Sequence, residues 1–228
     1  MKTNWRVELA LILLIAAMFA GALIVWPSAP DQIPVHWNVG GDVDRYGGKV
    51  EGLLGIPLLT LGLYLLMRYI PRIDPGRANY ARFGGAYTAM RAGLVVLMAG
   101  IYGVVLAWVL KWPVDVSRVV PVGVGALFIL FGAVLGKVRP NWFVGIRTPW
   151  TISSKTSWVR THRLGGWLFV ALGVLFAVTG FFKLGRFGFV TVGAVIAVVV
   201  ILFAYSYVVW RADPEKQPPA GTQPADDE

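Results

Sequence analysis

Residues 7–26 read VELALILLIAAMFAGALIVW, and this stretch decides the fold. Glu8 is its one ionisable residue, and the stretch has the length of about 20 apolar residues that a helix needs to cross the hydrocarbon core of a bilayer. It is long for the core of a signal peptide, and no small-residue cleavage site precedes Pro27. We therefore interpret it as a retained membrane span.

Five further stretches have the same character, and the composition agrees with them. Of all residues 57% are hydrophobic and 14% are charged, whereas a soluble domain carries about a quarter charged residues. The sequence predicts an all-α membrane protein with six transmembrane helices. The five further spans are expected at Gly52–Ile70, Tyr87–Leu110, Val116–Gly136, Gly165–Phe182 and Phe187–Trp210.

The distribution of Lys and Arg predicts how these spans are oriented. If the N-terminus lies inside the cell, most of the 21 Lys and Arg residues fall in inner segments, as cytoplasmic loops require. The outer loops then hold Arg45, Lys49, Lys111, Arg118, Lys183 and Arg186. We expect both termini in the cytoplasm. The net charge of +9 then reflects Lys and Arg residues in cytoplasmic loops that face anionic lipid headgroups. We expect no nucleic-acid partner.

The first outer loop, from Pro27 to Glu51, is longer and more patterned than a plain turn. Its prolines predict an extended entry, and the residues from Val35 to Asn38 are expected to form a short strand or turn before Gly40-Gly41. The structural interpretation is that Asp42 and Asp44 bind backbone amides in turns, with His36 packed beside Trp37. The alternatives are a ligand- or peptide-binding loop and a metal site at His36, Asp42 and Asp44.

The inner loop from Lys137 to Arg163 is the second patterned segment. Pro140 and Pro149 interrupt any helix, and Thr151, Ser153 or Ser154 is a candidate N-cap for a helix that enters the fifth span. On that helix the spacing places Trp158, Thr161 and His162 on one face.

Two functions are open for this inner loop. Arg147, Arg160 and Arg163, with the polar residues Asn141, Thr148 and Thr151, have the chemistry to cradle a phosphate or carboxylate. The simpler interpretation is a loop that Arg and Trp anchor to anionic headgroups.

Charge is nearly absent from the spans themselves. Glu8 lies near the start of the first span, and Arg82 and Arg91 flank the third, where they are expected to snorkel toward the inner surface. No acid lies in the middle of a span, which argues against an ion-driven transporter. Gly132 and Gly136, four residues apart, predict close helix packing.

At the two patterned loops the sequence resembles a known family. The segment RPNWFVGIRTPWTISS at 139–154, followed by WVRTHRLGG at 158–166, is similar to the signature of the SdpI family of bacterial membrane proteins. The segment PDQIPVHWNVGGDVDRYGGK at 30–49 resembles a small domain of unknown function often found ahead of the SdpI region. We therefore expect an N-terminal region at 1–86, an SdpI-like region at 87–211 and a disordered tail at 212–228.

The resemblance implies a function and two sets of binding residues. The family's best-known member is an immunity protein against a secreted killing peptide, also described as a receptor for a cytoplasmic repressor. The implied role is a membrane immunity or receptor-like protein of the bacterial plasma membrane, not an enzyme. We expect no cofactor and no bound metal. The inner candidates are Asn141, Gly145, Arg147, Thr148, Pro149, Trp150, Thr161, His162 and Arg163. The outer ones are His36, Asn38, Asp44 and Lys49, to which Asp42 is added for the chemistry of its side chain.

Two other classes of function remain as alternatives. The first is a transporter or lipid-handling protein whose basic, Trp-rich inner loop binds a headgroup. The second is an enzyme with a metal-bound water at His36, Asp42 and Asp44. The expected partners under the main interpretation are the bilayer, a secreted toxin peptide and a cytoplasmic repressor.

Overall fold

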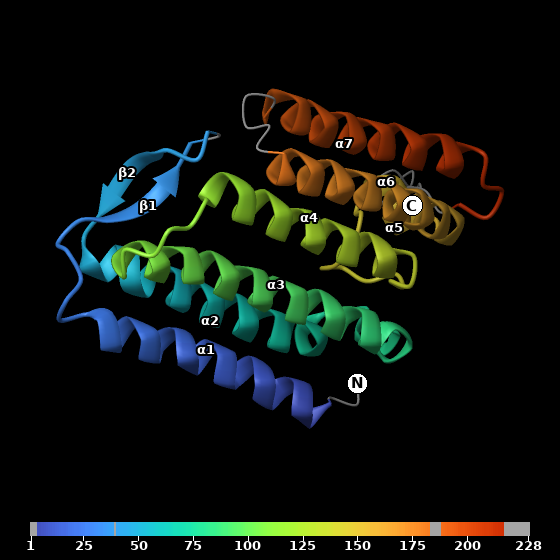
Figure 1. Ribbon diagram of the computed structural model, residues 1–228. Coiled ribbons are helices and arrows are strands. Elements are labelled where there is room, and N and C mark those ends of the chain that lie inside the picture. Colours follow the sequence, from blue (N-terminus) through green and yellow to red (C-terminus); the bar gives the residue numbers. More distant parts are fainter. Residues whose placement is uncertain (1–3, 39, 183–187, 217–228) are drawn as a thin grey trace, which may run out of the picture.

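The computed structural model describes residues 4–38, 40–182 and 188–216, and six long helices run side by side in it (Figure 1). Each of the six is long and apolar enough to cross a membrane, which confirms the predicted fold class. The helices are α1 (Trp5–Val25), α2 (Lys49–Ile73), α3 (Tyr80–Val109), α4 (Val116–Leu135), α6 (Lys155–Phe181) and α7 (Gly188–Arg211).

The helices form two layers of three (Figure 1). One layer holds α1, α2 and α3, and the other holds α4, α6 and α7; α3 and α4 connect them. Strands β1 (Ile33–Trp37) and β2 (Val43–Gly47) form an antiparallel hairpin at one end of the bundle, which we call the hairpin end. The short helices η1 (Arg77–Asn79) and α5 (Pro149–Ser153) lie at the opposite end, with the motif loop of residues 137–148. We call that end the motif-loop end.

In the second layer, one predicted helix cap and one of the two predicted packing glycines are confirmed. Ser154, one of the three N-cap candidates, caps α6 and accepts a hydrogen bond from the Ser157 amide at 2.9 Å. Helices α4 and α6 lie so close that a Cβ on Gly132 would come within 2.5 Å of the Gly166 carbonyl oxygen. Gly136, by contrast, faces open space. Of the glycine pair predicted to allow close helix packing, only Gly132 makes such a contact.

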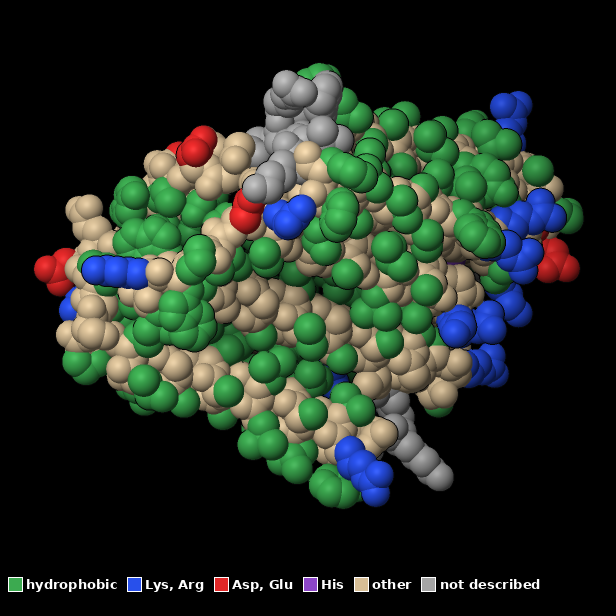
Figure 2. Space-filling view, viewed as in Figure 1, with side chains coloured by type: hydrophobic (Ala, Val, Ile, Leu, Met, Phe, Trp, Pro, Cys, Tyr) green, Lys and Arg blue, Asp and Glu red, His purple; other side chains and the backbone are tan. Residues whose placement is uncertain are grey.

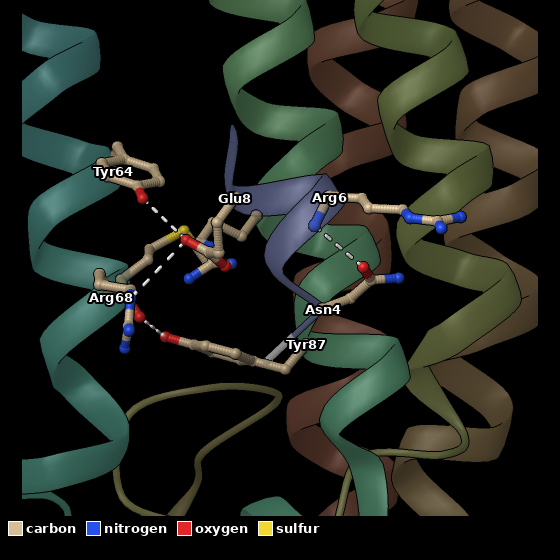
Figure 3. A network of polar contacts seen from close by, with 8 residues as sticks. Asn4, Arg6, Glu8, Tyr64, Arg68 and Tyr87 are labelled. Atoms are coloured by element: carbon tan, nitrogen blue, oxygen red, sulfur yellow. Dashed lines mark hydrogen bonds and ion pairs between the residues drawn. The ribbon is translucent and has the colours of Figure 1, made fainter. Parts of the chain in front are cut away.

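The first layer is joined by a buried polar network, and here one prediction is wrong. Arg91 does not snorkel: it is 1% exposed and forms an ion pair with Glu8 of α1. The other Glu8 oxygen accepts a hydrogen bond from the Tyr64 hydroxyl at 2.7 Å and lies 3.7 Å from Nε of Arg68, both on α2 (Figure 3). An acid from α1 thus offsets the cost of burying Arg91 between the helices. Arg82, in contrast, is exposed.

The surface charge differs between the two ends. On the face shown in Figure 2, Lys and Arg side chains gather at the motif-loop end, while the hairpin end carries acidic and basic side chains, with a hydrophobic band between them. This distribution agrees with a cytoplasmic motif loop. The cytoplasmic position of the termini stays a prediction, and Lys183, Arg186 and residues 217–228 of the expected disordered tail lie outside the described residues.

Candidate functional site

The motif loop is held in shape by Asn141, which is almost completely buried. Its Oδ1 accepts hydrogen bonds from the amides of Phe143 and Val144, at 2.9 and 2.6 Å. Its Nδ2 donates to the carbonyl oxygens of Arg139 and Val144, at 2.9 and 2.8 Å. One side chain therefore satisfies backbone groups on both sides of the loop, and its polar atoms are engaged within the protein.

His162 fixes the next turn of the same loop. Its Nδ1 donates to the Trp158 carbonyl at 2.8 Å, and its Nε2 accepts from the Ile146 amide at 3.0 Å, so the ring is neutral and both nitrogens are used. Its ring stacks on Trp158 with centroids 4.1 Å apart. Gly145 passes over the ring with φ of +111°, and a Cβ there would lie 2.3 Å from Nε2. Trp158, Thr161 and His162 are all buried, as their predicted common face requires.

Hydroxyl groups attach α5 and α6 to α7 at this end. Thr148 caps α5 and donates to the Ser206 hydroxyl at 2.9 Å, while Ser157 donates to the Ser206 carbonyl at 2.8 Å. Ser154 donates to Asp213, beyond the end of α7. That hydrogen bond lowers the pKa of Asp213 below its usual range, so the carboxylate stays ionised and accepting.

The remaining motif residues do not take part in these buried hydrogen bonds. Arg147, Arg163 and Pro149 are exposed, and Trp150 packs against Phe203 and Tyr207 of α7. The Arg147 guanidinium donates to the Trp142 carbonyl oxygen. The expected cradle is therefore not assembled: the arginines face outward, while Asn141, Thr148 and Thr151 are buried in contacts within the protein.

Sequence reasoning missed Asp74, which connects the two layers at the motif-loop end. Its carboxylate is 1% exposed and accepts hydrogen bonds from the Tyr80 hydroxyl at 2.8 Å and from the Trp142 amide at 3.1 Å. Nearby, Asn79 donates to the Pro140 carbonyl at 2.7 Å. Asp74 opens an Asp-Pro-Gly turn, a sequence typical of a turn in which the Asp side chain binds backbone amides, and that signal was available.

At the hairpin end the turn between the strands depends on Asn38. Its Oδ1 accepts from the amides of Gly40 and Asp42, at 2.8 and 3.0 Å. Gly41 has φ of +89° and lies against Ser117 of α4. The turn-stabilising role that the sequence assigned to Asp42 therefore belongs to Asn38, and Asp42 itself accepts from the Asn38 side-chain amide at 3.4 Å.

The charged candidates of the hairpin end have separate partners. Asp44 lies 2.6 Å from Nδ1 of His36, across the two strands, and Lys49 lies 3.7 Å from Asp31. In the described part of the chain, no group of three or more His, Asp or Glu side chains could hold a metal ion. His36, Asp42 and Asp44 thus do not assemble the metal site considered from the sequence.

A cavity of about 650 Å³ lies between the hairpin and both helix layers. We call it the hairpin-end cavity. A second, apolar hollow of about 340 Å³ between α3 and α4 shares Ile101 and Val120 with it. The described residues that line the hairpin-end cavity are Val35, His36, Trp37, Asn38, Gly41, Asp44, Ile56, Ile101, Val116, Ser117, Val120, Pro121, Phe176, Thr179, Gly188 and Thr191.

Comparisons with known proteins match two regions of the chain. Residues 137–206 match the SdpI/YfhL protein family, and residues 12–61 match a domain of unknown function, DUF1648. The chain is 27% identical over 171 residues to a protein of Bacillus subtilis named immunity protein SdpI, covering 75% of this chain and 80% of that protein. No solved structure matches.

The six apolar helices and these matches define a multi-pass protein of the bacterial plasma membrane. Within that class, the chain is similar to the SdpI family over residues 137–206 and to DUF1648 over residues 12–61, as the resemblance at its two loops predicted. The matched family is not a family of enzymes.

Proposed function

We propose that this protein is a membrane immunity protein of the SdpI type, which neutralises or senses a membrane-active peptide at the hairpin end and signals to a cytoplasmic partner through the motif loop. The observation that carries the proposal is that both matched regions meet at one cavity. His36 and Asp44 come from the DUF1648 region, and Thr179 and Thr191 come from the SdpI region. The similarity to the Bacillus subtilis immunity protein SdpI supports immunity as the role.

The fold offers a route between the two ends. The layers are connected at the motif-loop end by Asp74 and Trp142, and they enclose the cavity at the hairpin end. A ligand that alters their separation at the cavity would act on this connection, because α3 contributes Ile101 to the cavity and Tyr80 to the Asp74 contact. A ligand shifts such an equilibrium only if it binds the two arrangements with different affinity.

Survival of a sensitive bacterium tests the immunity role. The gene is expressed in such a host, and survival is measured across a panel of membrane-active peptides, with membrane expression verified by immunoblot. An empty vector is the negative control, and Asp31→Asn, a change at an exposed acid that does not line the cavity, is the matched variant. We expect protection against at least one peptide from the wild type and from Asp31→Asn. Absence of protection across the panel would contradict the proposal.

Lipid-headgroup binding is a second candidate, favoured by the outward-facing Arg147 and Arg163 beside the exposed Trp142 and Trp167. Arginine and tryptophan at a membrane surface bind anionic headgroups. The test compares the lipids that copurify with the wild type and with Arg147→Ala. A loss of anionic lipid from the variant is expected if the site is specific, whereas identical lipid profiles argue against it.

A further inference from the structure

The side chains that line the hairpin-end cavity share a chemical property: their polar atoms are mostly hydrogen-bond acceptors. The hydroxyl of Thr179 donates to the Phe176 carbonyl at 2.9 Å, and that of Thr191 donates to the Gly188 carbonyl at 2.7 Å. Each hydroxyl proton is therefore used inside its own helix, and the oxygen lone pairs remain as acceptors. Ser117 is in the same state, because its hydroxyl donates to Asp115 at 2.6 Å.

His36 and Asp44 extend this acceptor surface to the hairpin. A carboxylate only accepts, so Nδ1 of His36 donates to Asp44 across their 2.6 Å contact, and the Asp44 carboxylate retains further lone pairs as acceptors. Asp44 is the one acid among the described lining residues, and no Lys or Arg is among them. The side-chain amide of Asn38 is already engaged in the turn.

Such a lining selects a ligand by charge and by hydrogen bonding. A primary ammonium group brings three donors, no acceptor and a positive charge, and so complements Asp44 and the hydroxyl oxygens. A phosphate or carboxylate brings acceptors to acceptors, and it finds no Lys or Arg among the described lining residues. A phospholipid headgroup, which always brings a phosphate, is therefore disfavoured.

The rest of the cavity is apolar. Its walls include Val35, Trp37, Ile56, Ile101, Val120 and Phe176. Ile101 and Val120 also line the neighbouring apolar hollow between α3 and α4, which lies along two membrane spans. A ligand of extended shape can thus place its apolar body against α3 and α4 while its charged end lies at Asp44.

We propose that the hairpin-end cavity is the binding site for an apolar peptide segment that carries a primary ammonium group, from a lysine or a free N-terminus. The proposal rests on the proposed function and names the class of its ligand. Asp44 is the counter-ion, and Thr179 and Thr191 accept from the ammonium or from peptide amides.

Photo-crosslinking to the full-length protein in zwitterionic lipid nanodiscs tests this site. The probe is a blocked ten-residue Leu/Ala peptide with one N-terminal lysine and one photo-leucine; its counterparts carry acetyllysine or glutamate in place of lysine. We expect the lysine probe to label segments 33–38, 40–44, 116–121, 176–182 and 188–191. This labelling is expected to be about tenfold stronger than with either counterpart, the difference that one charge-assisted contact gives. Equal labelling by all three, better labelling by the glutamate probe, or labelling confined to other segments would overturn the proposal.

Two variants on separate elements make the test independent of hairpin folding. Asp44→Asn keeps the shape of the side chain and removes its charge, and Thr191→Val on α7 removes one acceptor. We expect about a tenfold loss of lysine-probe labelling in the first and about a threefold loss in the second. Asp31→Asn, the matched control, keeps wild-type labelling. Unchanged labelling in both cavity variants would overturn the assignment.

A competition arm and the survival assay separate the possible failures. If the ligand is a peptide, dodecylamine displaces the lysine probe less than the unlabelled lysine peptide does at the same concentration. Stronger displacement by dodecylamine would overturn the assignment of a peptide as the ligand. If the probe labels the cavity as expected but the protein protects no host, the immunity function fails and the site stands. If the protein protects but the acetyllysine probe labels equally well, the site fails and the function stands.

Discussion

The two ends of this bundle use polar side chains in opposite ways. At the motif-loop end, the side chains of Asn141, His162 and Asp74 form hydrogen bonds with the protein's own backbone, and those of Asp74 also join the two layers. At the hairpin end the layers enclose a cavity, and Asp44 and Thr191 line it with acceptor atoms. A conspicuous polar motif can therefore be a folding element, while the residues of the proposed binding surface come from seven different helices and strands.

The largest expected effect concerns the buried ion pair of the first layer. Glu8→Gln leaves Arg91 buried without its counter-ion, and we expect a loss of about 4 kcal/mol in the free energy of unfolding. Thermal unfolding in detergent measures it. Arg6→Gln, an exposed change two residues away on the same helix, is the control and is expected to unfold as the wild type does. Equal changes in unfolding temperature for Glu8→Gln and Arg6→Gln would show that the Glu8–Arg91 ion pair does not stabilise the fold.

The next effect tests whether the motif loop is a folding element. Gly145→Ala places a Cβ against His162 and forces alanine to a φ of +111°, so we expect a loss of about 3 kcal/mol. The control Gly136→Ala introduces a methyl group into open space with ordinary helical φ and is expected to be neutral or slightly stabilising. If Gly145→Ala unfolds at the wild-type temperature, the loop does not depend on this contact.

A smaller effect is expected where the layers are connected. Asp74→Asn replaces an acceptor-only carboxylate that binds Tyr80 and the Trp142 amide, and a loss of about 2 kcal/mol is expected. Unfolding of this variant is compared with that of Asp31→Asn, whose carboxylate is 98% exposed. A wild-type melting curve for Asp74→Asn would show that the two layers are held together elsewhere.

The smallest effect is expected at the hairpin. The His36–Asp44 pair is exposed, so His36→Ala is expected to change the free energy of unfolding by less than about 1 kcal/mol. The same melting experiment measures it. A loss as large as that of Gly145→Ala would mean that the pair stabilises the fold, and the contrast between the two ends would disappear.

The sequence predicted the parts of this structure that depend on one segment at a time. Six apolar runs gave six helices, and the spacing of Trp158, Thr161 and His162 placed them on one buried face, because the period of a helix is local information. The Ser154 cap followed from the same kind of signal.

What the sequence did not predict depends on packing between distant segments. Arg91 lies toward the motif-loop end of its span, where the sequence predicted snorkelling, and only the approach of α1 brings Glu8 to it. The cavity needs α3, α4, α6 and α7 beside the hairpin, so no single run of residues signals it. The arginines of the inner loop were grouped with Asn141 because they are close to it in sequence. In the folded protein Asn141 is buried, whereas these arginines are exposed.

One chemical change made at each end tests the central contrast most directly. Asp44→Asn and Asp74→Asn are compared for unfolding temperature and for lysine-probe labelling per folded molecule. We predict that Asp44→Asn keeps the wild-type unfolding temperature and loses about tenfold in labelling, while Asp74→Asn unfolds at lower temperature and labels normally. The opposite result, with Asp44→Asn destabilised and labelled normally and Asp74→Asn stable but unlabelled, would contradict the account.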